Sequence, residues 1–279
     1  MSKPSMSKPS MSKPKPPDSA NYLAKKQFYR QLLTIYGRKP VLEALQEPGV
    51  GVHRLHLASS NDPAPILDQI VQLAQGHGAE ILQHSRAQLA RISKNGKQDQ
   101  GVAADLICAG FGDYRDFLTK PPRVHYELLA LDAVTNPQNL GMIIRSVCAG
   151  AIDGLILPSR GCAKIDPLVI KASTGTIFKT RILRCDSLAE ALADFKATGC
   201  EVYGLSSHAA TSIAGLQADR AAIYVLGNET QGVSETVAGL CDTSVSIPMN
   251  NGVESLNVAV AASLIAFRNL LRPPVNSAP

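Results

Sequence analysis

Apolar and polar positions alternate along the chain in a way that predicts two α/β units, at residues 35–110 and 126–272. In the first unit, short apolar runs alternate with stretches whose apolar residues recur every three or four positions. The second unit opens with Glu127–Asp132, whose four central residues are all apolar, as in a strand buried in a parallel sheet. The predicted fold class is therefore α/β. The predicted strands are residues 52–57, 80–83 and 102–108 in the first unit and 127–132, 154–157, 181–184, 201–205, 222–226 and 245–248 in the second, with helices at 65–75, at 85–92 and between the later strands.

The last apolar segment predicts a C-terminal helix that ends before Pro273 and Pro274. Ser255 stands at the expected N-cap position, and Arg268 and Arg272 fall in the expected last turn. Asn257 is a polar residue just inside this apolar helix, where an amide without partners would be costly to bury. Two interpretations of Asn257 stay open here: a satisfied capping residue, or a functional group.

The ends of the chain and the segment between the units have a different composition. Residues 1–34 contain three short Lys-Pro repeats, which predict a partly disordered extension with a helix near residues 21–33. Gly and Pro-Pro punctuate residues 111–125, which predict a linker, and residues 273–279 form a tail. Seven basic residues against Asp18 alone give residues 1–34 a charge of +6, so the remaining residues sum to −1 of the total +5. Such a basic arm suits a polyanion.

Composition narrows the class of protein further. The 45% hydrophobic and 18% charged content of the 279 residues is that of an ordinary globular protein. No apolar run is long enough to span a membrane and the N-terminus has no signal-peptide core, so we expect a cytoplasmic location and no membrane partner. The six cysteines include no Cys-x-x-Cys pair, and His53 and His56 are expected on opposite faces of a strand. Neither a disulfide framework nor a metal site is therefore predicted.

The first unit contains polar loops that can contact RNA. Residues 94–101 have no apolar side chain to pack, so they form either an ordinary turn or a surface for phosphates and base edges. The candidate RNA-binding residues are Arg38, Lys39, Lys94, Asn95, Lys97 and Gln100, together with Arg145 of the second unit.

Polar residues also interrupt the start of a helix after the first strand of the second unit. Asn136 can cap this helix and Pro137 suits its first turn. Asn139 and Arg145 are six residues apart and share a helix face only if the helix begins early. Arg145 has apolar neighbours, so its guanidinium either reaches solvent or binds an anion.

A second polar stretch, Leu226–Gly232, follows the predicted strand 222–226. A buried strand that ends in Gly-x-Glu-x-x-Gly lies at the carboxyl edge of the sheet, where open α/β sheets bind ligands. The stretch is not a P-loop, because Val233 and Ser234 follow Gly232 in place of Lys and Ser or Thr. The Gly-x-Gly-x-x-Gly of a dinucleotide site is absent as well.

Three stretches in this order resemble the motifs of the SpoU–TrmH family of RNA 2′-O-ribose methyltransferases, in the SPOUT class. Asn139 to Arg145 matches the first motif, Leu226 to Gly232 the second, and Ile247–Met249 followed by Ser255–Val258 the third. The resemblance spans about residues 127–271, and residues 35–108 resemble the L30e-like substrate-binding domain of such enzymes. It implies a C-terminal trefoil knot, an exception to the rule that connections avoid threading.

The resemblance also implies a cofactor, a partner and roles for individual residues. It implies that S-adenosylmethionine is the methyl donor, that no metal takes part, and that the enzyme is a homodimer. Arg145 would hold a phosphate and stabilise developing oxyanion charge, because a guanidinium seldom gives up its proton. Asn139 would orient Arg145, Glu229 would hold Arg145 or Ser255 or relay the proton, and Ser255 and Asn257 would shape the site. The implied cofactor-binding residues are Leu226, Gly227, Asn228, Ile247, Met249, Ser255 and Leu256.

Other functions remain open from the sequence. The favoured substrate is a guanosine in ribosomal RNA, and a transfer-RNA ribose or a resistance-type ribosomal adenosine is an alternative. A non-catalytic RNA-binding or ribosome-assembly protein would not need all five of the predicted catalytic residues. A nicotinamide or ATP enzyme is disfavoured, because the glycine fingerprint is missing.

Overall fold

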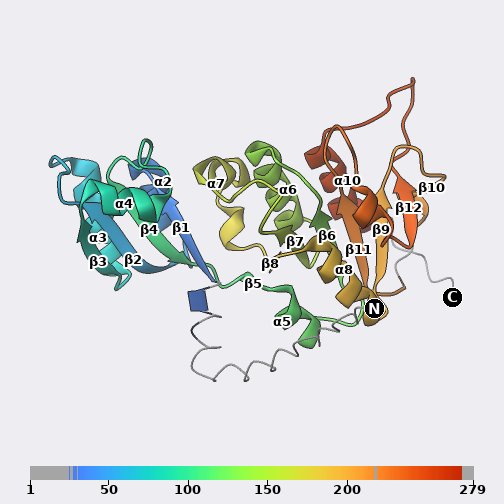
Figure 1. Ribbon diagram of the computed structural model, residues 1–279, viewed down its shortest axis with the longest axis horizontal. Helices are drawn as coiled ribbons and strands as arrows, with labels where there is room; N and C mark the ends of the chain where they lie inside the picture. The colour runs from blue at the N-terminus through green and yellow to red at the C-terminus, as the bar shows by residue number, and fades with distance from the viewer. Residues whose placement is uncertain (1–24, 26–27, 30, 217–218, 272–279) are drawn as a thin grey trace, which may run out of the picture.

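The computed structural model describes residues 25, 28, 29, 31–216 and 219–271. Two α/β units lie side by side: a smaller one that begins with the strand at residue 32, and a larger one that ends with the helix at residue 271 (Figure 1). The predicted properties of residues 1–24 and 273–279, and the position of Arg272, lie outside the described residues.

Four strands form the sheet of the smaller unit in the order β1–β4–β2–β3. β2 and β3 are parallel, and β4 is antiparallel to both β1 and β2. The ends of β1, β2 and β3 therefore meet the start of β4 at one side of the sheet, which we call the loop edge. The strands are β1 (Leu32–Tyr36), β2 (Gly51–Ala58), β3 (Glu80–His84) and β4 (Val102–Ile107).

Helices cover the two faces of this sheet unequally. α2 (Arg38–Gln46) and α3 (Pro65–Gly76) bury the face that carries Leu55 and Leu106. Of the helices that the structure describes, α4 (Arg86–Ser93) packs on the opposite face, where Leu89 contacts Ala58 and Ala103. Ser85 and Gln88 form a capping box that begins α4 directly after β3. One part of the second face is therefore left for polar side chains.

Eight parallel strands form the sheet of the larger unit, in the order β10–β12–β9–β11–β6–β7–β8–β5. The central strands β6 and β11 are buried at every residue, which agrees with their continuous apolar sequences. The strands are β5 (Phe111–Asp113), β6 (Glu127–Leu131), β7 (Gly154–Pro158), β8 (Ile182–Cys185), β9 (Glu201–Leu205), β10 (Thr211–Ser212), β11 (Ala222–Leu226) and β12 (Thr243–Ser246).

Helices cover both faces of the larger sheet and make three layers (Figure 1). α6 (Pro137–Ala149), α7 (Pro167–Ser173) and α10 (Val258–Leu271) pack on one face. α5 (Tyr114–Thr119), α8 (Leu188–Ala197) and α9 (Glu235–Ala238) pack on the other. Two short 3₁₀ turns, η1 (Thr176–Phe178) and η2 (Ile213–Gly215), complete the described elements.

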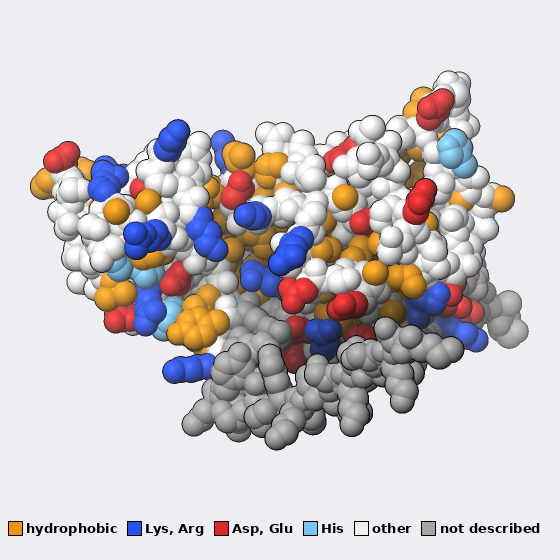
Figure 2. All heavy atoms as spheres, in the orientation of Figure 1, with side chains coloured by type: hydrophobic (Ala, Val, Ile, Leu, Met, Phe, Trp, Pro, Cys, Tyr) orange, Lys and Arg blue, Asp and Glu red, His pale blue; other side chains and the backbone are white. Residues whose placement is uncertain are grey.

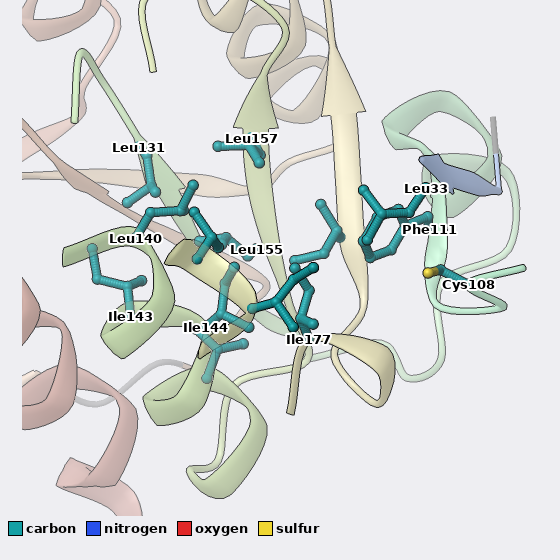
Figure 3. Close-up of a cluster of buried hydrophobic side chains, with 14 of the residues drawn as sticks. Leu33, Cys108, Phe111, Leu131, Leu140, Ile143, Ile144, Leu155, Leu157 and Ile177 are labelled. Carbon is teal, nitrogen blue, oxygen red and sulfur yellow. The ribbon is translucent and has the colours of Figure 1, made fainter. Parts of the chain in front are cut away.

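The two units share part of one hydrophobic core. Figure 3 shows Leu33 and Cys108 of the smaller unit beside Phe111, which begins the larger one. The units also meet where Glu47, at the end of α2, lies against Gly175. A Cβ atom on Gly175 would lie 2.8 Å from Oε1 of Glu47, and its φ of +78° also favours glycine. These contacts restrain the small sheet relative to the large one.

The structure corrects several predicted elements. Residues 111–125 are not a plain linker, because β5 pairs with β8 and α5 buries Tyr114 and Phe117. Leu32 and Leu33 lie in β1 and not in a helix, because they pair with β4. The last long strand ends at Ser246, two residues before the predicted end at Pro248, which has no N–H to donate to a ladder. The two-residue strand β10 was not predicted.

The predicted α/β class with a small sheet domain before a parallel-sheet domain is confirmed. The trefoil knot implied by the resemblance stays a prediction, as do the domain boundaries. Within the described part of the chain, no helix combines the length and apolar character needed to cross a membrane.

Candidate active site

A cavity of about 520 Å³ opens at the carboxyl edge of the large sheet, beside the ends of β9, β11 and β12. Open α/β sheets bind ligands at this edge, and the volume lies in the range of about 300–1,000 Å³ for small-molecule sites. The cavity is lined by all seven residues predicted to bind the cofactor: Leu226, Gly227, Asn228, Ile247, Met249, Ser255 and Leu256.

The loop after β11 owes its shape to Gly227 and Asn228. The main chain of Asn228 exchanges two hydrogen bonds with that of Gly232, at 2.9 and 2.8 Å, which folds the loop back on itself. A Cβ atom on Gly227 would lie 2.0 Å from the carbonyl carbon of Gly232, so only glycine fits. The Asn228 side chain accepts from the N–H groups of Thr230 and Gln231 and donates to the carbonyl of Ala133. The Gly-x-Glu-x-x-Gly pattern is thus a tight loop tied to the end of β6.

Three predicted site residues form a directed chain of hydrogen bonds beside the cavity, which we call the amide–carboxylate chain. Asn257 Nδ2 donates to Asn139 Oδ1 at 3.1 Å. Asn139 Nδ2 in turn donates to Glu229 Oε1 at 2.6 Å. Asn139 is buried and satisfied at both ends, whereas Glu229 is exposed and lines the cavity. The chain therefore holds one carboxylate at the cavity wall by a charge-assisted hydrogen bond.

The position of Asn257 shows that it has two roles. Helix α10 begins at Val258, and Asn257 Oδ1 accepts the main-chain N–H of Ala259 at 2.8 Å. Asn257, and not Ser255 as predicted, thus caps the helix, because Ser255 lies three residues before the first helical residue. Its Nδ2 remains free to donate to Asn139. The capping interpretation left open by the sequence is confirmed, and a functional role for Asn257 stays a prediction.

The first predicted motif, Asn139 to Arg145, lies entirely on helix α6. Asn136 Oδ1 caps α6 by accepting the N–H groups of Gln138 and Asn139, and Pro137 is the first helical residue. Arg145 lies further along α6, exposed, and forms no hydrogen bond or ion pair with any described residue. The prediction that Asn139 orients Arg145 does not match these contacts, because both ends of the Asn139 amide are engaged by Asn257 and Glu229.

The sequence interpretation missed a group of cavity-lining residues after β9. Residues 204–208 line the cavity opposite Leu226, because β9 and β11 are neighbours in the sheet. The sequence signal for these residues was their place directly after the predicted strand 201–205. Ligands bind at the carboxyl ends of neighbouring strands, so the end of this strand belonged together with the end of β11. Asp132, at the end of β6, was also missed; its carboxylate accepts the N–H of Ser234 at 2.7 Å and supports the loop after Gly232.

The cavity wall includes one thiol, Cys241, next to Gly204. Burial raises the pKa of Cys241 above its ordinary range, so the group is a neutral thiol near pH 7. A neutral thiol is a poor nucleophile. Over the ranges that the structure describes, His, Cys, Asp and Glu nowhere gather in threes suited to a metal ion.

The candidate RNA-binding residues of the smaller unit gather at the loop edge. The Arg38 main-chain N–H donates to Gln100 Oε1 at 3.0 Å, and Arg38 Nε donates to the Gln100 carbonyl at 3.1 Å. Asn95 Nδ2 donates to the Tyr36 hydroxyl at 3.0 Å, which ties the loop to the end of β1. The exposed side chains that project from this edge are Lys39, Lys94 and Lys97. Arg145 alone of the predicted set lies in the other unit.

The larger unit is a parallel α/β sheet with a cavity at its carboxyl edge and a carboxylate held beside that cavity. The smaller unit is a separate domain with a cationic edge. Together these features define an enzyme that brings a small molecule to a polyanion.

Two family models cover nearly all of this architecture. The SpoU rRNA Methylase family matches residues 127–267, and the RNA 2′-O ribose methyltransferase substrate-binding family matches residues 34–107. A protein described as an uncharacterized tRNA/rRNA methyltransferase from Mycolicibacterium vanbaalenii is 34% identical over 233 residues, which is 83% of this chain and 74% of the relative. The chain therefore belongs to the SpoU family of RNA methyltransferases.

Solved structures show the same fold. The SpoU methyltransferase AviRb from Streptomyces viridochromogenes, crystallised with AdoMet, has a TM-score of 0.62 at 24% identity, covering 90% of this chain and 92% of its own. A TrmH-family protein from Porphyromonas gingivalis has a TM-score of 0.58 at 26% identity, covering 90% of this chain and 97% of its own.

Proposed function

We propose that this enzyme transfers a methyl group from S-adenosylmethionine to a ribose 2′-hydroxyl of structured RNA, at a guanosine of ribosomal RNA. The observation that carries the proposal is the amide–carboxylate chain, which ends in Glu229 at the wall of the cavity. A purely RNA-binding protein would not require a carboxylate held by two buried or capping amides at that point. We place this activity in the cytoplasm.

The cavity fits the methyl donor in size and in the character of its wall. Leu226, Ile247, Met249 and Leu256 provide an apolar surface for a nucleoside, and the loop of Gly227 and Asn228 provides main-chain polar groups. These residues, with Ser255, would hold S-adenosylmethionine, which supplies a sulfonium-activated methyl group when bound. Transfer of the methyl group from the sulfonium requires no metal.

The hydroxyl that receives the methyl group must lose its proton, and Glu229 is placed to take part. Asn139 occupies one of its carboxylate oxygens, which leaves the other to accept a hydrogen bond from the ribose hydroxyl. A fixed carboxylate orients the hydroxyl and relays its proton. Because the hydroxyl is held in place by this contact, positioning supplies most of the rate acceleration. Asn139 and Asn257 act through Glu229 and are positioning residues.

Arg145 supplies positive charge. Its exposed guanidinium has no acidic partner among the residues that the structure describes, so it is free to bind an RNA phosphate bidentately. In that position it holds the nucleotide and stabilises developing negative charge on the ribose oxygen.

We propose that the enzyme acts as a homodimer. Met142 of α6 and Val260 and Leu264 of α10 are 42%, 48% and 40% exposed, and Ser146 and Ser263 join these helices by a 2.7 Å hydrogen bond. Exposed apolar residues on two adjoining helices favour association with a second copy. Arg145 lies on the same helix as Met142, so a second copy on this surface would bring Arg145 close to the dimer interface.

The decisive experiment is methyl transfer from labelled S-adenosylmethionine to RNA from cells that lack this protein, followed by digestion to nucleosides. Label on 2′-O-methylguanosine of ribosomal RNA is the expected result. Label on transfer RNA would keep the reaction and correct the substrate. Label on no RNA, from a folded protein that binds the cofactor, would contradict the proposal and favour a binding function.

Arg145→Ala tests the assigned residue in the same assay. We expect a loss of methyl transfer of about 100-fold or more with cofactor binding retained, because a group that stabilises transition-state charge is removed. Arg220→Ala is the matched control, since Arg220 is exposed and only weakly paired with Glu201, at 4.0 Å. Full turnover by Arg145→Ala would refute the assignment.

A further inference from the structure

The smaller unit carries a line of polar side chains on the sheet face that α4 covers only in part. Thr34 Oγ1 donates to Asp105 Oδ1 at 2.6 Å, and the other Asp105 oxygen lies 3.1 Å from His56 Nε2. His56 Nδ1 lies 2.9 Å from His84 Nε2. Each residue comes from a different strand, so the line crosses the whole sheet from β1 to β3. We call it the Asp105–His56–His84 relay.

The chemistry of the relay determines which nitrogen carries each proton. Burial by itself would raise the pKa of Asp105, but its hydrogen bonds with His56 and Thr34 hold the pKa below the ordinary range, so the carboxylate is ionised near neutral pH. An ionised carboxylate only accepts, and His56 Nε2 must therefore carry a proton. In neutral His56 the other nitrogen, Nδ1, then accepts from His84 Nε2–H. Nδ1 of neutral His84 is left as an acceptor.

One added proton reverses the outer half of the relay. When both nitrogens of His56 carry protons, Nδ1–H donates to His84 Nε2, and the proton of His84 moves to its Nδ1. The outer nitrogen of His84 then changes from a hydrogen-bond acceptor to a donor. Burial and the adjacent His56 lower the pKa of His84, so a second proton on this pair of rings is disfavoured.

His84 stands among the residues of the loop edge. It ends β3, and its carbonyl accepts the N–H of Ser59, while Asn61 Nδ2 donates to Gly101 at the start of β4. His84 is half-buried, and His56 is 4% exposed. The His56 ring is thus shielded from solvent, and the His84 ring meets solvent beside the polar loops. The edge is cationic, because Lys39, Lys94 and Lys97 project from it.

The charged groups around the relay do not fix its protonation state by themselves. Arg54 is bonded to Glu80 at 2.8 Å, so these two charges largely neutralise each other. On α4, Arg86 donates to Ser60 and lies 3.9 Å from Asp99, and Arg91 is exposed. The other groups near the relay are His53, which contacts Phe28, and Tyr29. Asp105 is the only acid in direct contact with a relay imidazole among the residues described.

We propose that His84, positioned by His56 and Asp105, is an RNA-contacting residue that binds a backbone phosphate when the relay takes up a proton. The inference rests on the proposed RNA substrate and extends the RNA surface beyond the lysines and the 94–101 loop. The donor form of His84 adds a hydrogen bond to a phosphate oxygen, while the acceptor form faces that oxygen with a lone pair. RNA binding should therefore strengthen as the pH falls.

The test measures binding of the full chain to a fluorescein-labelled transcript of large-subunit ribosomal RNA, at constant ionic strength, between pH 8 and pH 5.5. We expect the affinity of the unmodified protein to rise about tenfold over this range, the effect of one charge-assisted contact. In His84→Gln, the amide can still pair with His56 but cannot be protonated, so this rise should be lost. His125→Gln is the matched control, because His125 is an exposed histidine of the larger unit outside the relay, and it should retain the rise.

A second measurement separates an RNA contact from a structural role. The imidazole ring signals of His84, followed by NMR, should change with pH, and bound RNA should move their midpoint to higher pH. Equal pH profiles for His84→Gln and the unmodified protein, or a midpoint unmoved by RNA, would overturn this inference alone. Absence of RNA binding by the unmodified protein at every pH would instead overturn the RNA substrate, and the inference with it.

Discussion

The two sheets of this protein present their polar groups differently. The large sheet is buried on both faces, and the polar side chains of the candidate site, Asn139, Glu229 and Asn257, meet beside the carboxyl ends of its strands. The small sheet has one partly open face, and Asp105, His56 and His84 follow each other across its strands. The large sheet thus offers a cavity at its carboxyl edge, and the small sheet offers a line of polar side chains that ends at half-buried His84.

The difference suits two different ligands. A cofactor is small and is enclosed by loops whose main chain fits closely, so Gly227 has no tolerance for a side chain. RNA is large and anionic, and we propose that it is met by the projecting lysines and by His84, whose hydrogen-bonding character changes with protonation. Substitutions in the large unit should therefore cause large losses of methyl transfer, whereas substitutions in the small unit should cause small losses of RNA affinity.

Gly227→Ala should have the largest effect. Its Cβ atom would overlap the Gly232 main chain, and the loop that forms the cavity wall would have to open. We expect loss of cofactor binding by calorimetry and a methyl-transfer rate at least about 100-fold lower. Gly215→Ala is the control, because a Cβ atom there has no neighbour within 4 Å. Normal cofactor affinity in Gly227→Ala would show that the loop is adaptable and would weaken the contrast between the sheets.

Asn139→Ala should reduce the methyl-transfer rate by about 100-fold through misplacement of Glu229, with RNA affinity unchanged. Asn257→Ala should act through the same contact, so the double variant should be little worse than either single one. Rate measurements on the three variants test this non-additivity. Gln138→Ala, an exposed amide on the same helix, is the control. Fully additive losses would show that the two amides act separately.

Asp105→Asn should destabilise the small unit by about 1–3 kcal/mol at pH 7, because a bonded and largely buried carboxylate is lost. The folded-state pKa of Asp105 is depressed, so its stabilising contribution is present above the unfolded value of about 3.9 and is lost as the pH falls through the folded value. The difference in thermal midpoint from the unmodified protein should thus shrink below about pH 4. Asp62→Asn, at an exposed loop position, is the control. A difference that does not change with pH would assign the loss to packing.

Lys97→Ala should have the smallest effect. Removal of one phosphate contact should weaken RNA binding a few-fold at low salt and reduce the slope of log K against log salt by about 0.7–0.9. Lys120→Ala, an exposed lysine of the other unit, should leave the slope unchanged. Equal slopes for Lys97→Ala and the unmodified protein would remove the 94–101 loop from the RNA surface.

Much of the fold follows from the local pattern of residues. The central strands of the large sheet were predictable because continuous apolar runs such as that of β11 fit only a strand with both faces buried. Residues 111–119 were misjudged because Gly and Pro residues around them are typical of loops, while the burial of Phe111 and Tyr114 depends on β8 and α8, distant in the sequence. The cavity-lining residues after β11 and β12 were implied by the family resemblance, but those after β9 required the strand order.

The sequence by itself determined the class of fold and placed the second motif at the carboxyl end of a buried strand, because both depend on spacing along one segment. Asn139, Glu229 and Asn257 were singled out through the resemblance of three separate motifs to a known family. Only the tertiary structure decided the partners of those residues. Asn139 contacts Glu229 across 90 positions and Asn257 across 118, and no local pattern encodes such pairs. The same holds for Asp105, His56 and His84, which the order of strands in the small sheet brings into line. Local periodicity specifies elements, whereas the meeting of polar side chains depends on how the whole chain packs.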